Sequence, residues 1–204
     1  MKVIRIFLLL PVLILFFSLT GCITSVGKKY YQLHLDNSGP PVTVGKSDIH
    51  SGDKVLLVEA VEVETIYDDY RVVYRRSPYQ LNYYSYHFWI KKPGKLVRDS
   101  IRDYLSKSNI FKKVIKDYSE GSPDLLLHAS VHILEEFDQP GIWFAHLKMD
   151  IEIKDFKSNQ TVFSHSFDRH RRLPRKKVER LPAAISKILK DELDIAAKKL
   201  LQLD

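Results

Sequence analysis

Four ionisable side chains in the middle of the chain are of types that bind metal ions or transfer protons. His128 and His132 are four positions apart, and His146 and Asp150 follow in the next apolar segment. On one strand, His128 and His132 would share a face but stand about 13 Å apart, too far to ligate one ion. A metal site would therefore need His146 or Asp150 from a neighbouring strand. We interpret the four as polar residues on a wet or subunit-covered face and predict no metal.

Motifs of common catalytic sites are absent from the sequence. It contains no G-x-S-x-G, no phosphate-binding loop and no HExxH. We therefore predict neither an enzyme nor a cofactor.

The only cysteine, Cys22, follows a long apolar segment. Lys2 and Arg5 precede an apolar run from residue 6 to 17, interrupted only by Pro11. A basic start, a short apolar core and then small residues are typical of a secretory signal peptide. A core of roughly 12 residues is shorter than the about 20 that a bilayer span needs, although an uncleaved membrane helix is the alternative. A single cysteine forms no disulfide within the chain.

The sequence LTGC, from Leu19 to Cys22, resembles the lipobox of bacterial lipoproteins. This resemblance implies that the Cys22 thiolate takes a diacylglyceryl group, that the preceding bond is cut, and that the new amine receives another acyl chain such as palmitate. Two or three acyl chains anchor a protein firmly, whereas one gives marginal binding. Ile23 stands where inner-membrane lipoproteins of enteric bacteria have Asp, which favours the outer membrane.

The expected mature chain is one domain. Removal of the signal peptide, residues 1–21, leaves 183 residues and lowers the formal net charge from +7 to +5. Residues 22–53 would hold the lipidated N-terminus, a first strand and a loop rich in Gly, Pro, Ser and Asp from Asn37 to Asp53. Residues 54–204 would complete a domain that starts near residue 30.

Strand patterns dominate the rest of the chain. Residues 54–64 form a β-branched apolar run that is typical of a covered central strand. Residues 124–137 and 144–156 alternate polar and apolar side chains, with Ile133 on the apolar side of the first. Residues 161–167 would close an antiparallel meander with them.

Two helices complete the expected fold. Apolar spacings of three and four predict one from Pro93 to about residues 107–109. A second runs from about Arg175 to the C-terminus, with Leu181 as an alternative start because Pro182 fits a first turn. The predicted fold class is α+β, a single domain with a mixed or antiparallel sheet and two helices on one face.

An aromatic strand, NYYSYHFW over residues 82–89, is a candidate interaction surface. Seven of the 11 tyrosines lie within 20 residues, at 67, 70, 74, 79, 83, 84 and 86. If a helix covers one face of this strand, the other presents Tyr83, His87 and Trp89 for self-association or partner docking. The alternative is that both faces lie in the core.

A basic segment, RHRRLPRKK, is a candidate membrane or partner patch. It contains Arg169, Arg171, Arg172, Arg175, Lys176 and Lys177. Near acidic lipid headgroups each such side chain contributes about 1 kcal/mol, and an exported protein is not expected to bind nucleic acid. The alternatives are a solvated loop, or neutralisation within the fold by the acids at positions 59, 62, 64, 68 and 69.

The order of these segments resembles the ABC-type transport auxiliary lipoprotein family. After the lipobox come YYQLHL, VLLVEAVEV, the block YRRSPYQLNYYSYHFWIKKPGKLVRDSIRDYLSKSNIFKKV, SPDLLLHASVHILEEF, AHLKMDIEIKD and a terminal helix. The resemblance covers nearly the whole mature chain. The chain departs from the family at Lys92, where a second proline is frequent, and at Asn109, near the family's glycine; Asn tolerates the left-handed conformation of a helix end.

The resemblance implies a function. Such lipoproteins work beside an ABC permease, its ATPase and an MCE-domain protein that move phospholipids or other apolar molecules between bacterial membranes. They perform no known catalysis; they seat the MCE assembly at a membrane, and some form rings, which implies a homo-oligomer. Direct binding of phospholipid stays open.

Two other classes of function are compatible with the residues. One is a periplasm-facing ligand-binding lipoprotein or envelope hydrolase without a transporter partner, which needs a pocket with convergent polar groups. The other is a standalone lipoprotein that fastens peptidoglycan, but the sequence shows no recognisable wall-binding motif.

Changing Cys22 to Ser is expected to abolish transport, because serine cannot carry the thioether-linked lipid of the anchor. Transport of apolar molecules in cells measures the effect, with Ser25→Ala as a nearby control. Normal transport by Cys22→Ser would contradict the expected anchor.

Overall fold

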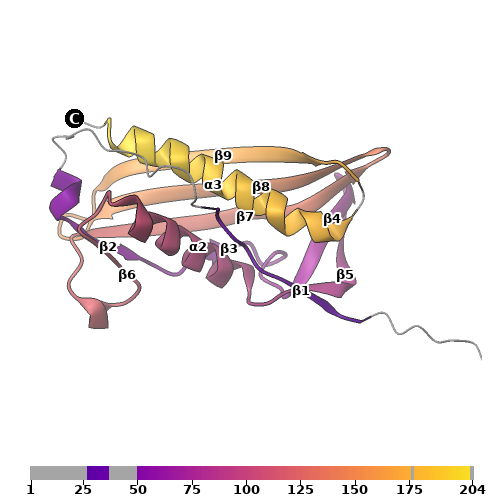
Figure 1. The fold of residues 1–204 in the computed structure, drawn as a ribbon, viewed down its shortest axis with the longest axis horizontal. Coiled ribbons are helices and arrows are strands. Elements are labelled where there is room, and N and C mark those ends of the chain that lie inside the picture. The colour runs from indigo at the N-terminus through magenta and orange to yellow at the C-terminus, as the bar shows by residue number, and fades with distance from the viewer. Residues whose placement is uncertain (1–26, 37–49, 176, 203–204) are drawn as a thin grey trace, which may run out of the picture.

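The computed structural model describes residues 27–36, 50–175 and 177–202. In this part of the chain, nine strands form one sheet, and two α-helices lie on one of its faces (Figure 1). The predicted α+β class, with a mixed sheet and two helices on one face, is confirmed. None of the helices among these residues is both long and apolar enough to cross a membrane.

Three long antiparallel strands run the length of the sheet. They are β7 (Leu125–Gln139), β8 (Ile142–Asp155) and β9 (Thr161–Leu173). Gly141, at a φ of 79°, and Asn159, at 54°, stand in the two turns, where the left-handed conformation suits these residue types. The predicted meander is thus confirmed, although β9 continues six residues beyond Phe167.

A β-bulge in β7 changes which of its side chains reach the core. Val131 pairs with Met149, but Ile133 pairs with Lys148, so β7 contains one extra residue. Beyond the bulge, Leu134 is buried, while Ile133 is only half-buried. The prediction that Ile133 shares the apolar face is therefore wrong, because the inserted residue ends the strict alternation.

Two groups of shorter strands pair with the other edge of β7. Near its start, β2 (Val55–Val58) and β3 (Glu62–Val63) run parallel to β7, and β6 (Lys113–Ile115) pairs with β2. The single central strand predicted for residues 54–64 is thus two strands. Short 3-10 turns, η1 (His50–Asp53) and η2 (Tyr118–Glu120), lie at this end.

Near the end of β7, the second group of strands pairs in the order β4 (Arg71–Ser77), β5 (Gln80–Trp89) and β1 (Lys29–Tyr31), so that the N-terminal strand lies farthest from β7. β4 runs parallel to β7, β5 is antiparallel to β4, and β1 is parallel to β5. β1 is therefore an edge strand at this end of the molecule, as β9 is on the far side of β8.

Both helices begin where their sequences predict, and the first also ends there, whereas the second ends at Leu200 rather than running on to the C-terminus. α2 (Pro93–Ser108) has proline in its first turn and stops at Asn109, whose φ of 56° is left-handed. α3 (Leu181–Leu200) starts at Leu181, the later of the two predicted starts, after a short 3-10 turn, η3 (Val178–Arg180).

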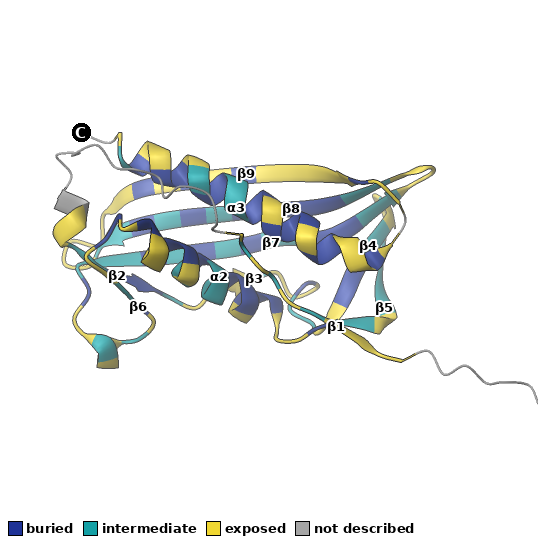
Figure 2. Cartoon of the chain, in the orientation of Figure 1, coloured by how far each residue is buried: buried dark blue, intermediate teal, exposed yellow. Residues whose placement is uncertain are grey.

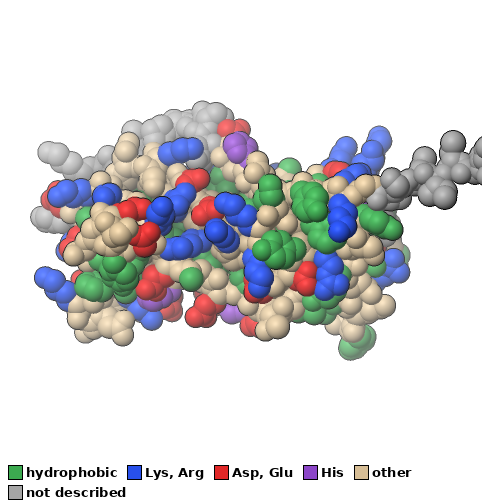
Figure 3. Space-filling view, turned by 90° about the horizontal axis from the view of Figure 1, so that it is seen from below, with side chains coloured by type: hydrophobic (Ala, Val, Ile, Leu, Met, Phe, Trp, Pro, Cys, Tyr) green, Lys and Arg blue, Asp and Glu red, His purple; other side chains and the backbone are tan. Residues whose placement is uncertain are grey.

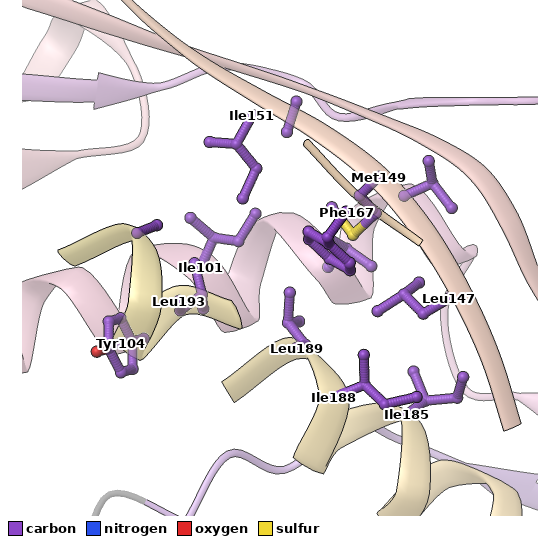
Figure 4. Packing of buried hydrophobic residues seen from close by; sticks show 14 of the residues in the cluster. Ile101, Tyr104, Leu147, Met149, Ile151, Phe167, Ile185, Ile188, Leu189 and Leu193 are labelled. Atoms are coloured by element: carbon purple, nitrogen blue, oxygen red, sulfur yellow. The ribbon is translucent and has the colours of Figure 1, made fainter. Parts of the chain in front are cut away.

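The core lies between the helices and the sheet. The buried sides of α2 and α3 face the strands, while their exposed sides face solvent (Figure 2). Side chains of both helices meet those of β8 and β9 in one cluster (Figure 4) that includes Ile101, Tyr104, Leu147, Met149, Ile151, Phe167, Ile185, Ile188, Leu189 and Leu193. Burial of this apolar surface is the main term that stabilises the fold.

Gly94→Ala is expected to lower the free energy of unfolding by about 1–3 kcal/mol, although alanine has the higher helix propensity. A Cβ atom at Gly94 would stand 2.8 Å from the carbonyl oxygen of Val61 and 3.1 Å from Cγ2 of Val63. Chemical denaturation measures the change. Gly52→Ala is the matched control, because a Cβ there meets nothing within 4 Å. A Gly94→Ala protein as stable as wild type would contradict the close approach.

Candidate functional site

The aromatic strand and the basic segment meet at one end of the molecule. An open depression of about 780 Å³ is lined by Tyr84 and His87 of β5 and by residues 177–180, which precede α3. Lys29 of β1 and Glu179 of η3 form an ion pair at 2.5 Å across this junction. The structure therefore places side by side two surfaces that the sequence only suggested separately.

Exposed aromatic and aliphatic side chains line the β1–β5 edge of this end. Tyr30, Tyr86 and Ile90 are 60%, 47% and 55% exposed. Tyr30 pairs across the strands with Phe88, and their ring centroids lie 5.7 Å apart. The ammonium of Lys28 lies 5.5 Å from the Phe88 ring, within reach of a cation–π contact. We call Tyr30, Tyr86, Phe88 and Ile90 the aromatic edge.

The three residues proposed from the aromatic strand differ in their surroundings. Tyr83 is half-buried, and its hydroxyl donates a hydrogen bond to the carbonyl oxygen of Ile66 at 3.0 Å. His87 is also half-buried; its Nδ1 lies 2.6 Å from the Tyr31 hydroxyl, and burial lowers its pKa. Trp89 is only 2% exposed and belongs to the core cluster.

The interpretation of Trp89 as a surface residue is therefore wrong. Its strand ends beside Tyr31 of β1, and the chain then turns into α2, whose apolar face shares the same core. An aromatic residue at such a junction is covered from both sides.

The described Arg and Lys residues of the basic segment are all exposed, and two of them also contact α3. Arg169 and Arg171 lie in β9, not in a loop, and face α3: Arg169 Nε is 2.5 Å from Glu192 Oε1, and Arg171 Nη1 is 3.6 Å from Asp191. Arg172, Arg175 and Lys177 are exposed. The acids that contact Arg169 and Arg171 belong to α3. Neutralisation of these two arginines by the acids at positions 59, 62, 64, 68 and 69 is therefore wrong. Lys176 and Cys22 lie outside the described residues.

Two of the buried carboxylates tie elements together, and no sequence pattern predicted either of them. Glu135, on β7 just beyond the bulge, is fully buried and accepts hydrogen bonds from the Tyr67 hydroxyl at 2.7 Å and from Arg75 Nε at 2.6 Å. His146 Nδ1 lies 3.6 Å away. Burial raises the pKa of Glu135, but nearby His146 and the hydrogen bonds from Arg75 and Tyr67 outweigh it and hold the pKa below its usual range.

The second carboxylate, Glu192 of α3, ties this helix to β9. It is 3% exposed, and its two oxygens lie 2.9 Å from His165 Nε2 and 2.5 Å from Arg169 Nε. His165 is itself buried. A buried charge without such partners is costly, so these contacts fix the position of α3 along the strand.

The four side chains considered as metal ligands do not come together. His132 Nε2 contacts Asp150 at 2.6 Å, and His128 Nδ1 contacts Glu59 at 2.5 Å. His146 lies elsewhere on the sheet, beside residues of β9. The strand registers decide this outcome, and the sequence does not show them.

Comparison with known proteins gives the family of the chain. Residues 31–194 match the family described as ABC-type transport auxiliary lipoprotein component, and the chain belongs to this family. The resemblance drawn from the segment order is confirmed. The chain is thus an auxiliary lipoprotein of ABC-type transport, a family of envelope lipoproteins and not a known enzyme family. No curated protein matches it.

Solved structures share the fold. A crystal structure of a Xanthomonas campestris protein has a TM-score of 0.67 at 18% identity and covers 85% of this chain and 95% of that one. A second crystal structure has a TM-score of 0.65 at 16% identity, over 85% and 99%. A subunit of the PelC dodecamer from Paraburkholderia phytofirmans reaches 0.48 at 10%, over 74% and 95%. At these identities the first two similarities establish the fold alone.

Arg75→Ala is expected to lower the free energy of unfolding by about 3 kcal/mol at neutral pH, because it leaves the buried Glu135 carboxylate without its cation. The loss should shrink as the pH falls through the folded-state pKa of Glu135, since protonation removes the buried charge. Denaturation at several pH values measures both effects.

The neighbouring Arg76→Ala is the matched control, because Arg76 is exposed. Equal effects of the two substitutions, or a loss that does not depend on pH, would contradict the role assigned to Arg75.

Proposed function

We propose that this lipoprotein is the anchored subunit that seats a periplasmic MCE-domain protein, with its ABC permease and ATPase, on a membrane. In this role it helps to move phospholipids or other apolar molecules across the periplasm. Membership of the transport auxiliary family supports the accessory role. The finer proposal rests on one observation: exposed aromatic and basic side chains gather at the end of the molecule where β1 begins.

The distance from the proposed lipid to the domain is short. We propose that residues 1–21 are removed and that Cys22 is lipidated; Lys29 follows Cys22 by seven positions. Fully extended, seven residues reach roughly 25 Å. The β1–β5 end is thus the part of the domain that such an anchor holds against the membrane. Because Ile23 follows the cysteine, we propose the outer membrane.

The side chains at this end fit a membrane surface. Lys28, Lys29, Arg172, Arg175 and Lys177 are exposed there, and Figure 3 shows hydrophobic side chains interspersed with Lys and Arg at the end that carries β1, β4 and β5. Cations near anionic headgroups contribute about 1 kcal/mol each, and tyrosine favours the membrane–water interface. We propose that the basic residues lie toward headgroups.

The adjacent aromatic edge is the proposed contact for the partner protein and for other copies of the chain. Tyrosines with an apolar ring and a polar tip are enriched in protein interfaces. His87 lines the depression at the same end, and Tyr83 lies half-buried on the same strand, whereas Trp89 is excluded by its burial. A ligand-binding lipoprotein without a transporter is the competing function.

Tyr86→Asp is expected to lower recovery of the MCE-domain protein and its permease by at least about tenfold, because a charge would enter the proposed interface. The measurement is co-purification with tagged full-length protein from gently solubilised membranes, quantified by mass spectrometry. Tyr118→Asp is the matched control, because Tyr118 is 58% exposed and belongs to η2, which lies at the other end of the sheet.

Two results would count against the proposal. Recovery of the lipoprotein alone, even after crosslinking, would reject the transporter role. Equal recovery with Tyr86→Asp and Tyr118→Asp would reject the aromatic edge as the contact.

A further inference from the structure

Three potential metal ligands from β8 and β9 meet on the sheet face opposite the helices. His146, Asp168 and His170 each offer a nitrogen or oxygen atom, and these atoms all lie within 4.8 Å of one another. His146 Nε2 is 2.8 Å from Asp168 Oδ1, and the two imidazole rings stack with centroids 3.8 Å apart. The register creates the group, because His146 pairs with His170, and Asp168 stands two positions earlier on the same face of β9.

We propose that His146, Asp168 and His170 form a binding site for Zn²⁺ or a similar first-row divalent metal ion. Two imidazole nitrogens and one carboxylate oxygen are a common donor set for such ions. Bonds of about 2.0–2.2 Å place the ligand atoms of one tetrahedral ion roughly 3.3 Å apart. Because the two imidazole rings now stack, at least one of them must rotate about its side-chain bonds so that both nitrogens point at one ion.

A fourth coordination position would face outward. Asp168 and His170 are exposed at the surface of the sheet, while His146 is 8% exposed beneath them. Lys148 Nζ lies 3.7 Å from the Oδ2 atom of Asp168, which leaves Oδ1 for the ion. A water molecule or a side chain of another protein would complete the tetrahedron, an arrangement of three protein ligands and one exchangeable ligand.

The buried Glu135 supplies the second layer of such a site. Its Oε1 lies 3.6 Å from Nδ1 of His146. With Nε2 on a metal ion, Nδ1 carries the proton and faces this carboxylate, which is the arrangement that orients metal-bound histidines in proteins. Tyr67 and Arg75 hold Glu135 in place, so the acceptor for that proton is fixed beside His146.

The test is Zn²⁺ binding by the full-length protein in detergent. The affinity tag is removed, the protein is stripped with a chelator, and bound metal is counted by equilibrium dialysis with elemental analysis. We expect one ion per chain, and we expect Co²⁺ to give the visible absorption of tetrahedral cobalt. His170→Ala and Asp168→Asn should each weaken binding more than tenfold. Both residues are exposed, so circular dichroism should show an unchanged fold.

Asp150→Asn is the matched control, because Asp150 contacts His132 at 2.6 Å in a pair that has no second histidine; its metal binding should equal that of wild type. Absence of a Zn²⁺ ion from the wild-type protein would overturn the site. So would binding that persists in His170→Ala and Asp168→Asn. The measurement needs no transporter, so its outcome is independent of the proposed partner.

Discussion

The pairing of β7 along both of its edges is the constraint on which the rest of the fold depends. One edge meets β8 over its whole length, while the other meets β2 and β3 near its start and β4 near its end. The bulge lies between these two groups. It sends Glu135 to the outer face, where Tyr67 and Arg75 bind it, and Glu136 to the helix face, where the Tyr84 hydroxyl donates to it at 2.9 Å. Two adjacent buried carboxylates thereby fasten β4, β5 and their preceding loop to the long strands.

The charged side chains on the two faces of β9 make different contacts. Toward the helices, Arg169 and Arg171 contact acids of α3, and this side of the strand adds to packing. On the outer face stand Asp168, His170 and Arg172. An edge strand with so many charged side chains is also a poor template for uncontrolled pairing with other strands. The basic segment is thus partly structural, since Arg169 and Arg171 contact α3 even though their side chains stay about half exposed.

Much of the fold follows from local patterns in the sequence. Apolar spacings define both helices, together with Pro93 and left-handed Asn109 for α2 and Pro182 for α3, and alternation defines the meander. Whatever depends on register is not encoded locally: the bulge at residues 131–133 and the His146–His170 pair are set by how strands align across turns. The burial of Trp89 likewise depends on tertiary contacts: β1 is distant from it in sequence, and α2 follows it but packs back into the same core. The aromatic edge and the basic residues were predicted singly, but only the fold brings them to one end.

The parallel pairing of β1 with β5 gives an anchored lipoprotein a particular mechanical behaviour. A pull directed along the axis of β1 would load its hydrogen bonds to residues 87–90 of β5 together, in shear. The Lys29–Glu179 contact extends this load path to the start of α3. With lipid at Cys22, membrane tension would reach the folded core through the overlapping, parallel strands β1 and β5. The end of the domain that would bear this load also carries the aromatic edge.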